Sequence, residues 1–181
     1  IQDSSGGWTV NGILSLGAGV TLQMAGGSAI YVHGASNGRS GGSLYAGGTA
    51  DHPVTIASSR STPAAGDWYG IAFWPGSSGT LDHIHLSDAG RGGMGLVGSN
   101  TCCYITAILL DGASPTISNS VIDHSAGNYV EVIHGSLPVL HDNHFTLPAS
   151  GYGVTKKAGL LRRRSLTPPS MTGTLPVAHL V

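Results

Sequence analysis

The chain has 181 residues, which suits one domain or one short solenoid. Only 9% of the residues are charged, against about 25% in an ordinary globular domain, and the net charge is −1. A chain with this charge has no bulk attraction to nucleic acid or to an anionic membrane. It also lacks the run of about 18 apolar residues that a membrane-spanning helix needs, so we expect neither a nucleic-acid partner nor a membrane span.

The first third of the chain alternates short apolar runs with turn residues. Alternating or β-branched runs of this length indicate strands, and Gly-rich or Pro-containing text indicates the turns between them. Helical periodicity is not sustained for three turns anywhere in residues 1–155. We therefore predict strands at residues 8–10, 13–16, 20–24, 30–32, 43–46 and 54–57.

A repeat follows in the middle of the chain. Residues 107–122 and 130–145 superpose without a gap at an offset of 23, and residues 71–86 fit the same frame at an offset of 36. Residues 91–101 then form an insertion that leaves the stack. Each copy reads as two alternating strands joined by a Gly-containing turn, and such a unit buries its apolar face only by stacking on its neighbours.

The alternation also predicts which side chains face the interior. In the second strand the inward set includes one polar column, Ser120 and Asn143, whose side chains we expect to bond the backbone of the next repeat. In the first strand the inward pairs are Ile71 with Phe73, Ala107 with Leu109, and Val130 with Val132.

The last segment departs from the repeat. Residues 156–181 hold five of the eight Lys and Arg residues and three of the nine Pro residues. We predict one β-helix domain over residues 1–155, followed by a cap or tail, although a basic binding arm and a segment foreign to the repeat remain alternatives. The adjacent Cys102 and Cys103 suit a pair of small half-buried residues better than a strained ring between neighbours.

Four stretches carry a family resemblance: GILSLGAGVTLQM at 12–24, GGTADHPVTI at 47–56, GDWYGIAF at 66–73 and SPTISNSVI at 114–122. Together they resemble the secreted right-handed parallel β-helix repeat proteins of the pectate-lyase-like superfamily. The resemblance covers roughly residues 8–155. It implies an all-β, right-handed parallel β-helix with repeats of 22–36 residues, an extracellular location and contact with polysaccharide. It does not choose among lyase, glycosidase, esterase, adhesin and surface-module activities.

The repeat frame predicts an apolar patch on the outside of the first strands, formed by Trp74, Ile108, Leu110 and Ile133, with Glu131 beside it. An exposed apolar patch of this kind indicates a ligand platform or a contact between copies of the chain. The alternative is that the 91–101 insertion or the C-terminal segment covers it. We predict Trp74, Leu110, Ile133 and Glu131 as substrate-binding residues.

A candidate catalytic group adjoins that patch. Asp111 and His134 occupy equivalent positions in neighbouring repeats, roughly 5 Å apart by strand spacing, with Ser136 and Ser114 close by in sequence. A carboxylate that orients an imidazole, which activates a nucleophile, is the arrangement of acyl-transfer hydrolases. Turn Asp residues often bond only their own backbone, which is the structural alternative. We predict Asp111, His134 and Ser136 as the catalytic set of an ester-type hydrolase.

Other chemistries fit less well. Asp111 and Glu131 fall about 11 Å apart in this frame, beyond the range for glycoside hydrolysis. Residues 92–155 contain no Lys or Arg to serve as the base of a polysaccharide lyase. The histidine columns lie about 10 Å apart, too far for one zinc ion, so we predict no metal and no cofactor.

The sequence thus predicts an extracellular β-helix module that binds or processes polysaccharide on an exposed sheet face. An ester-type hydrolase using His134, Asp111 and a nearby Ser is the first alternative, and a non-catalytic structural or adhesion solenoid is the second. A homo-oligomer formed through the apolar face is also compatible with the pattern.

Overall fold

The computed structural model describes residues 2–4, 7–34, 41–94, 104–146 and 153–156, and these fold as strands and turns without a helix. Three sheets, named here A, B and C, contain the strands. Sheet A contains β1 (Gln2–Ser4), β2 (Gly7–Val10), β5 (Ala29–Val32), β8 (Gly70–Phe73), β11 (Thr106–Asp111), β14 (Asn128–Ile133) and β17 (Val154–Lys156). Sheet B contains β3 (Ile13–Leu16), β6 (Ser43–Gly47), β9 (Ser78–Asp82), β12 (Thr116–Ser118) and β15 (Val139–His141). Sheet C contains β4 (Thr21–Met24), β7 (Val54–Ser58), β10 (Ile84–Leu86), β13 (Val121–Ile122) and β16 (His144–Phe145).

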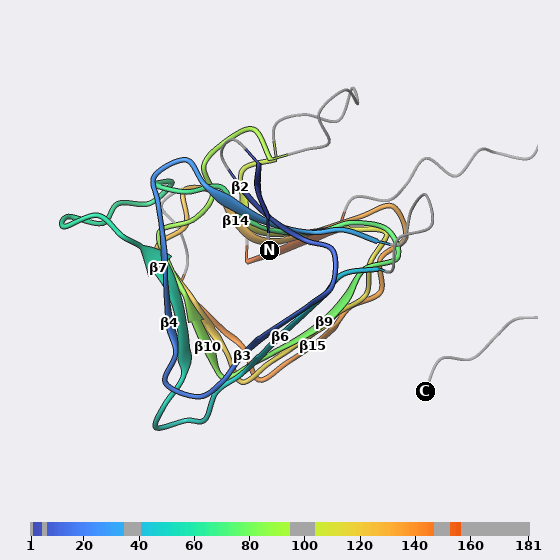
Figure 1. Cartoon of the computed structure of the whole chain (residues 1–181), viewed down its shortest axis with the longest axis horizontal. Coiled ribbons are helices and arrows are strands. Elements are labelled where there is room, and N and C mark those ends of the chain that lie inside the picture. Colours follow the sequence, from blue (N-terminus) through green and yellow to red (C-terminus); the bar gives the residue numbers. More distant parts are fainter. Residues whose placement is uncertain (1, 5–6, 35–40, 95–103, 147–152, 157–181) are drawn as a thin grey trace, which may run out of the picture.

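The chain winds repeatedly through the three sheets in the order A, B, C. Each sheet forms one side of a triangular prism that is seen end-on in Figure 1. Strands within a sheet are parallel, except that β1 runs antiparallel to β2. The all-β parallel solenoid expected from the sequence is therefore confirmed, as are the six strands predicted in the first third of the chain.

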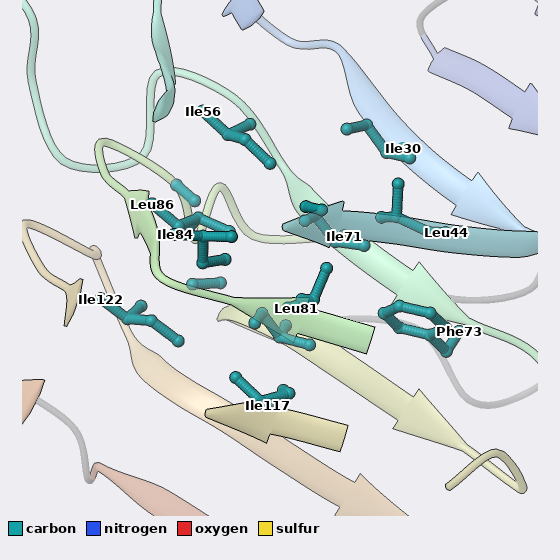
Figure 2. Packing of buried hydrophobic residues seen from close by; sticks show 14 of the residues in the cluster. Ile30, Leu44, Ile56, Ile71, Phe73, Leu81, Ile84, Leu86, Ile117 and Ile122 are labelled. Carbon is teal, nitrogen blue, oxygen red and sulfur yellow. The ribbon is translucent and has the colours of Figure 1, made fainter. Parts of the chain in front are cut away.

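The hydrophobic core fills the interior of the prism. Ile71 and Phe73 of sheet A, Leu81 of sheet B, and Ile84 and Leu86 of sheet C are all 0–1% exposed. Figure 2 shows these side chains pointing inward, together with their equivalents on neighbouring turns of the solenoid. A single turn presents only one layer of such residues, so each layer depends on the layers stacked on it for burial.

Each turn of the solenoid contains three strands, whereas the sequence predicted two in each of the three repeat copies over residues 71–145. The predicted second strand is broken by a bend at His83, Asn119 and Asp142, which have φ angles of 48°, 50° and 54°. A residue in this left-handed conformation redirects the chain, and Asn and Asp tolerate it better than most residues. The break separates sheet B from sheet C and so creates the third side of the prism.

The predicted inward polar column is confirmed at that bend. The Ser120 hydroxyl accepts a hydrogen bond from the Ile84 amide at 3.1 Å and donates to the Ser118 carbonyl at 2.6 Å. Asn143 accepts a bond from the Ser120 amide through Oδ1 at 3.1 Å and donates through Nδ2 to the Ile117 carbonyl at 2.7 Å. These side chains pair backbone groups that the bend removes from the strand ladders.

The register of β11 differs from the sequence prediction by one residue. Leu110 pairs with Phe73 on β8 and with Val132 on β14, whereas the next strand pairs Thr116 with Thr80 and with Val139. Thr116 thus follows Leu110 by six positions. In the turn before, Thr80 follows Phe73 by seven, and in the turn after, Val139 follows Val132 by seven. The β11–β12 turn is one residue shorter, and an ungapped superposition could not detect that.

A one-residue shift exchanges the two faces of a strand. Ile108 and Leu110 consequently lie in the core, and Leu109 lies on the outer face of sheet A. The prediction of Leu110 and Ile108 as outward residues was wrong, as was the inward assignment of Leu109.

Two sequence predictions fall outside the described residues: the state of Cys102 and Cys103, and the role of residues 157–181. In the described part of the chain, no helix is long and apolar enough to cross a membrane.

Candidate functional site

The outer face of sheet A is covered. Ala72, Trp74, Leu109 and Ile133 form a second apolar cluster with Met94, and Tyr31 and Tyr104 pack against it. Met94 and Tyr104 flank the insertion between β10 and β11 and pair as an antiparallel bridge. Met94 and Tyr104 therefore cover this part of the sheet, which fits the covered alternative that the sequence left open for this patch.

Burial removes this face as an open platform. Trp74 is 4% exposed, Ile133 3% and Glu131 2%, and the Trp74 ring stacks on Tyr31 at a centroid distance of 6.2 Å. The prediction that Trp74 and Ile133 form an exposed surface was wrong because the apolar patch is closed by its own chain. The same burial makes the patch unavailable for a contact with a second copy.

Asp111 and His134 do come together. Asp111 ends β11, and His134 follows β14 in the left-handed conformation with φ 49°. The His134 Nδ1 lies 2.6 Å from Asp111 Oδ1, with side-chain exposures of 54% and 7%. The buried carboxylate thus fixes the orientation of an imidazole whose other edge faces solvent. This is the pairing that the sequence predicted for these two residues.

Ser136 has a structural role instead of joining that pair. Its hydroxyl donates to the Leu110 and Ile133 carbonyls at 3.0 and 2.8 Å and accepts from the Ala113 amide at 3.1 Å. Ser77 makes the equivalent turn contact two turns earlier, donating to the Trp74 carbonyl at 2.7 Å. A serine that is 1% exposed and already bonded to three backbone groups is a poor nucleophile, so its predicted catalytic role is not supported by this geometry.

The separation of Asp111 and Glu131 also changes with the register. Glu131 pairs with Leu109, two residues from Asp111, so strand spacing places the two α-carbons about 8 Å apart rather than about 11 Å. Both carboxylates are at most 5% exposed, and the Asn128 amide donates to Glu131 at 3.2 Å. The spacing estimated from the sequence was therefore too long, and the pair lies beneath the covered face.

The Asp–His pairing recurs around the prism. Asp88 Oδ1 and His124 Nδ1 lie 2.6 Å apart with side-chain exposures of 6% and 54%, almost the values of the Asp111–His134 pair. Asp123 and His85 form a looser pair at 3.1 Å. The sequence showed the histidines but not these partners, because the partners lie on neighbouring turns of the solenoid. The described residues contain no group of three or more His, Cys, Asp or Glu side chains that could hold a metal ion.

An open cavity of about 270 Å³ lies beside β10 and β13, lined on one side by His83, His85 and Asp123. Val121 and Pro53 supply much of its apolar lining. Its His85–Asp123 contact links one turn of the solenoid to the next. This cavity could not be predicted from the sequence, because its walls come from three separate segments of the chain.

The outer face of sheet B bears partly exposed side chains suited to a polar ligand. Strand register aligns Ser15, Tyr45, Thr80 and Thr116 in one row across four strands. Tyr45 is 42% exposed, and beside that row the hydroxyls of Ser43 and Ser78 bond each other at 2.7 Å. The alternation within residues 43–47 was the available sequence signal for an outward Tyr45.

Asp82 adds a fixed negative charge to the edge of that face. Its Oδ1 accepts from Asn119 Nδ2 and from the Ser118 hydroxyl, both at 2.8 Å, and His83 Nδ1 lies 3.2 Å from Oδ2. The Asn119 hydrogen bond is the largest reason why the pKa of Asp82 lies below its usual value, although partial burial opposes the shift. Hydrogen bonds to the charged form therefore hold Asp82 as an acceptor in a fixed position.

Comparisons of the chain with protein-family models, with curated proteins and with solved structures found no match.

Proposed function

We propose that this chain is a polysaccharide-binding module that uses the outer face of sheet B. The observation that carries the proposal is the exposed Tyr45 ring, set within a row of hydroxyl side chains on a flat sheet. Ser15 and Thr80 flank it on the two neighbouring strands. The covered outer face of sheet A cannot offer a comparable surface.

The chemistry of this face matches that of a sugar chain. The apolar C–H side of a sugar ring packs on an aromatic ring, while sugar hydroxyls donate and accept hydrogen bonds. Thr80 and Ser78 provide hydroxyls that both donate and accept, and Asp82 provides a carboxylate that only accepts. Strands about 4.8 Å apart repeat these groups along the solenoid, so an extended ligand could contact several turns.

The finer structural expectations belong to the same proposal. A parallel strand connection is right-handed in nearly all proteins, which supports a right-handed β-helix. Membership of the pectate-lyase-like superfamily and an extracellular location rest on the sequence resemblance, which is an argument from analogy.

The proposal is tested by retention of the purified chain in gels or columns containing neutral and acidic polysaccharides. For a polysaccharide that retains the wild type, Tyr45→Ala is expected to weaken binding about 5- to 30-fold, the effect of losing about 1–2 kcal/mol of aromatic contact. Val121→Ala is the matched control, because it removes a 37% exposed apolar side chain from sheet C. Equal retention of the two variants would reject the sheet B surface.

A second candidate function is supported by the Asp111–His134 contact. Asp111 would hold the imidazole in one tautomer, leaving His134 Nε2 to remove a proton from water that attacks an ester carbonyl. The buried carboxylate and the 54% exposed imidazole suit these separate roles. Water replaces Ser136 as the nucleophile in this version of the hydrolase hypothesis.

The Asp88–His124 pair provides a control of almost identical geometry. With short nitrophenyl esters, His134→Ala should lower hydrolysis about 100-fold or more if His134 is the general base, whereas His124→Ala should leave the rate unchanged. Equal rates in the two variants would remove the hydrolase hypothesis. Absence of both ester hydrolysis and polysaccharide retention would instead support a purely structural solenoid.

A further inference from the structure

Two arginines approach one turn where sheet C passes into sheet A. A Cβ atom built on Gly26 would lie 3.3 Å from Arg60 Nη2, and one built on Gly27 would lie 3.6 Å from Arg91 Nη1. The two guanidinium groups therefore reach adjacent residues of the same turn. Lys156, on β17, is the remaining Lys or Arg within the described ranges.

The acidic group beside Arg60 is buried beneath it. Arg60 Nε lies 3.4 Å from Asp67 Oδ1, with side-chain exposures of 58% and 6%. Asp67 also accepts from the Ser58 hydroxyl at 2.7 Å and from the Ala64 amide at 3.0 Å. The Ser58 bond is the largest cause that lowers the pKa of Asp67. Arg60 thus contacts this carboxylate through its Nε edge, while Nη2 lies over the glycine turn.

Arg91 is exposed and is held by an aromatic ring. Its Cζ lies 5.8 Å from the centre of the Tyr69 ring, and its amide donates to the Trp68 carbonyl at 3.0 Å. Within the described ranges, no carboxylate forms an ion pair with Arg91. A cation–π contact orients a guanidinium without neutralising it, so Arg91 keeps its full charge at the surface.

His124 is a third basic side chain exposed at the same corner. It is 54% exposed and contacts Asp88 at 2.6 Å, while the Ser58 amide donates to the other Asp88 oxygen at 3.2 Å. Asp67 and Asp88 are 6% and 4% exposed. The acids therefore lie inside and the basic side chains lie outside, so an incoming ligand meets donors first.

We propose that Arg60 and Arg91 bind a phosphate or sulfate group over the Gly26–Gly27 turn. Guanidinium groups donate in a planar fork that matches two oxygens of such a group, and these charge-assisted bonds are strong. Glycine at both positions means that the turn itself places no side chain against the guanidinium nitrogens. The site is at a corner of the prism and is independent of polysaccharide binding on sheet B.

The test is an amide and arginine-side-chain NMR titration of the full chain with inorganic sulfate and with inorganic phosphate. Sodium chloride keeps the ionic strength constant, because general screening would otherwise mimic weak binding. Saturable shifts at Gly26, Gly27 and both arginine Nε–H groups are expected. Arg91→Gln should weaken binding about tenfold, the typical effect of losing a charge-assisted contact.

Two further variants separate the proposal from general charge effects. Lys156→Gln removes one positive charge from β17 and should leave the titration unchanged. Arg60→Gln should weaken it, while Asp67 keeps its bonds from Ser58 and Ala64. Non-saturating shifts, or equal weakening in Lys156→Gln and Arg91→Gln, would overturn the site. A monosaccharide sulfate, tested beside its neutral parent sugar, distinguishes an ester-linked group from a free ion as the preferred source.

Discussion

The inward polar column at the sheet B–sheet C bend permits a quantitative test of the fold. Ser120→Ala removes the acceptor of the Ile84 amide and the donor to the Ser118 carbonyl. Ser120 and Ile84 are each 1% exposed, so water cannot readily replace the lost acceptor. An unsatisfied buried donor costs about 1–3 kcal/mol, and we expect a loss of about 2 kcal/mol in the free energy of unfolding.

Thermal and urea unfolding followed by circular dichroism would measure this loss. For a chain of this size, about 2 kcal/mol corresponds to a fall in Tm of about 4–8 °C. Ser43→Ala is the matched control, because its hydroxyl bonds Ser78 on the solvent face, and its expected change is within about 0.5 kcal/mol. If Ser120→Ala were no more destabilising than Ser43→Ala, the column would not be satisfying buried backbone groups, and our reasoning would be refuted.

Three further predictions address the register, a close backbone contact and a charge. Leu110→Ala should destabilise the chain by about 2–5 kcal/mol, measured by urea unfolding, because Leu110 is in the core; a loss below about 1 kcal/mol would contradict the corrected register. Gly48→Ala should lower Tm clearly, since its Cβ would lie 2.3 Å from a backbone oxygen, whereas the neighbouring Gly47→Ala, with nothing within 4 Å, should not. The pKa of Asp82 is lowered, with the Asn119 hydrogen bond as the largest cause. Its stabilising contribution is therefore present above the unfolded pKa of about 3.9 and is lost as pH falls through the folded pKa. Asp82→Asn should flatten the curve of unfolding free energy against pH in that acidic window.

Periodicity was sufficient to predict the strands and much of the interior. The two inward polar residues, Ser120 and Asn143, were identified because each falls between inward apolar residues of its repeat copy. Leu110 was misplaced because the deletion that shifts its strand lies in a turn, where no apolar alternation marks the frame. The third strand of the repeat copies was missed because the bend before it uses His, Asn or Asp rather than glycine.

The candidate sites depended on contacts that sequence spacing does not encode. The Asp111–His134 pair was predicted because both residues adjoin the repeat whose frame was best defined. Burial of Trp74 depended on the packing of Met94 and Tyr104 over sheet A, which local alternation does not determine. The two arginines beside Gly26 and Gly27 are far apart in the sequence, and only the winding of the solenoid brings them to one turn.

The short β11–β12 turn has a consequence for how a solenoid of this kind can change over time. A one-codon deletion in a turn leaves the sheets paired on both sides but exchanges the buried and displayed residues of a single strand. Where both sets are apolar, as with Leu109 and Leu110, the exchange leaves the core filled. Such a strand would display a new set of outward residues after one genetic event and without any substitution.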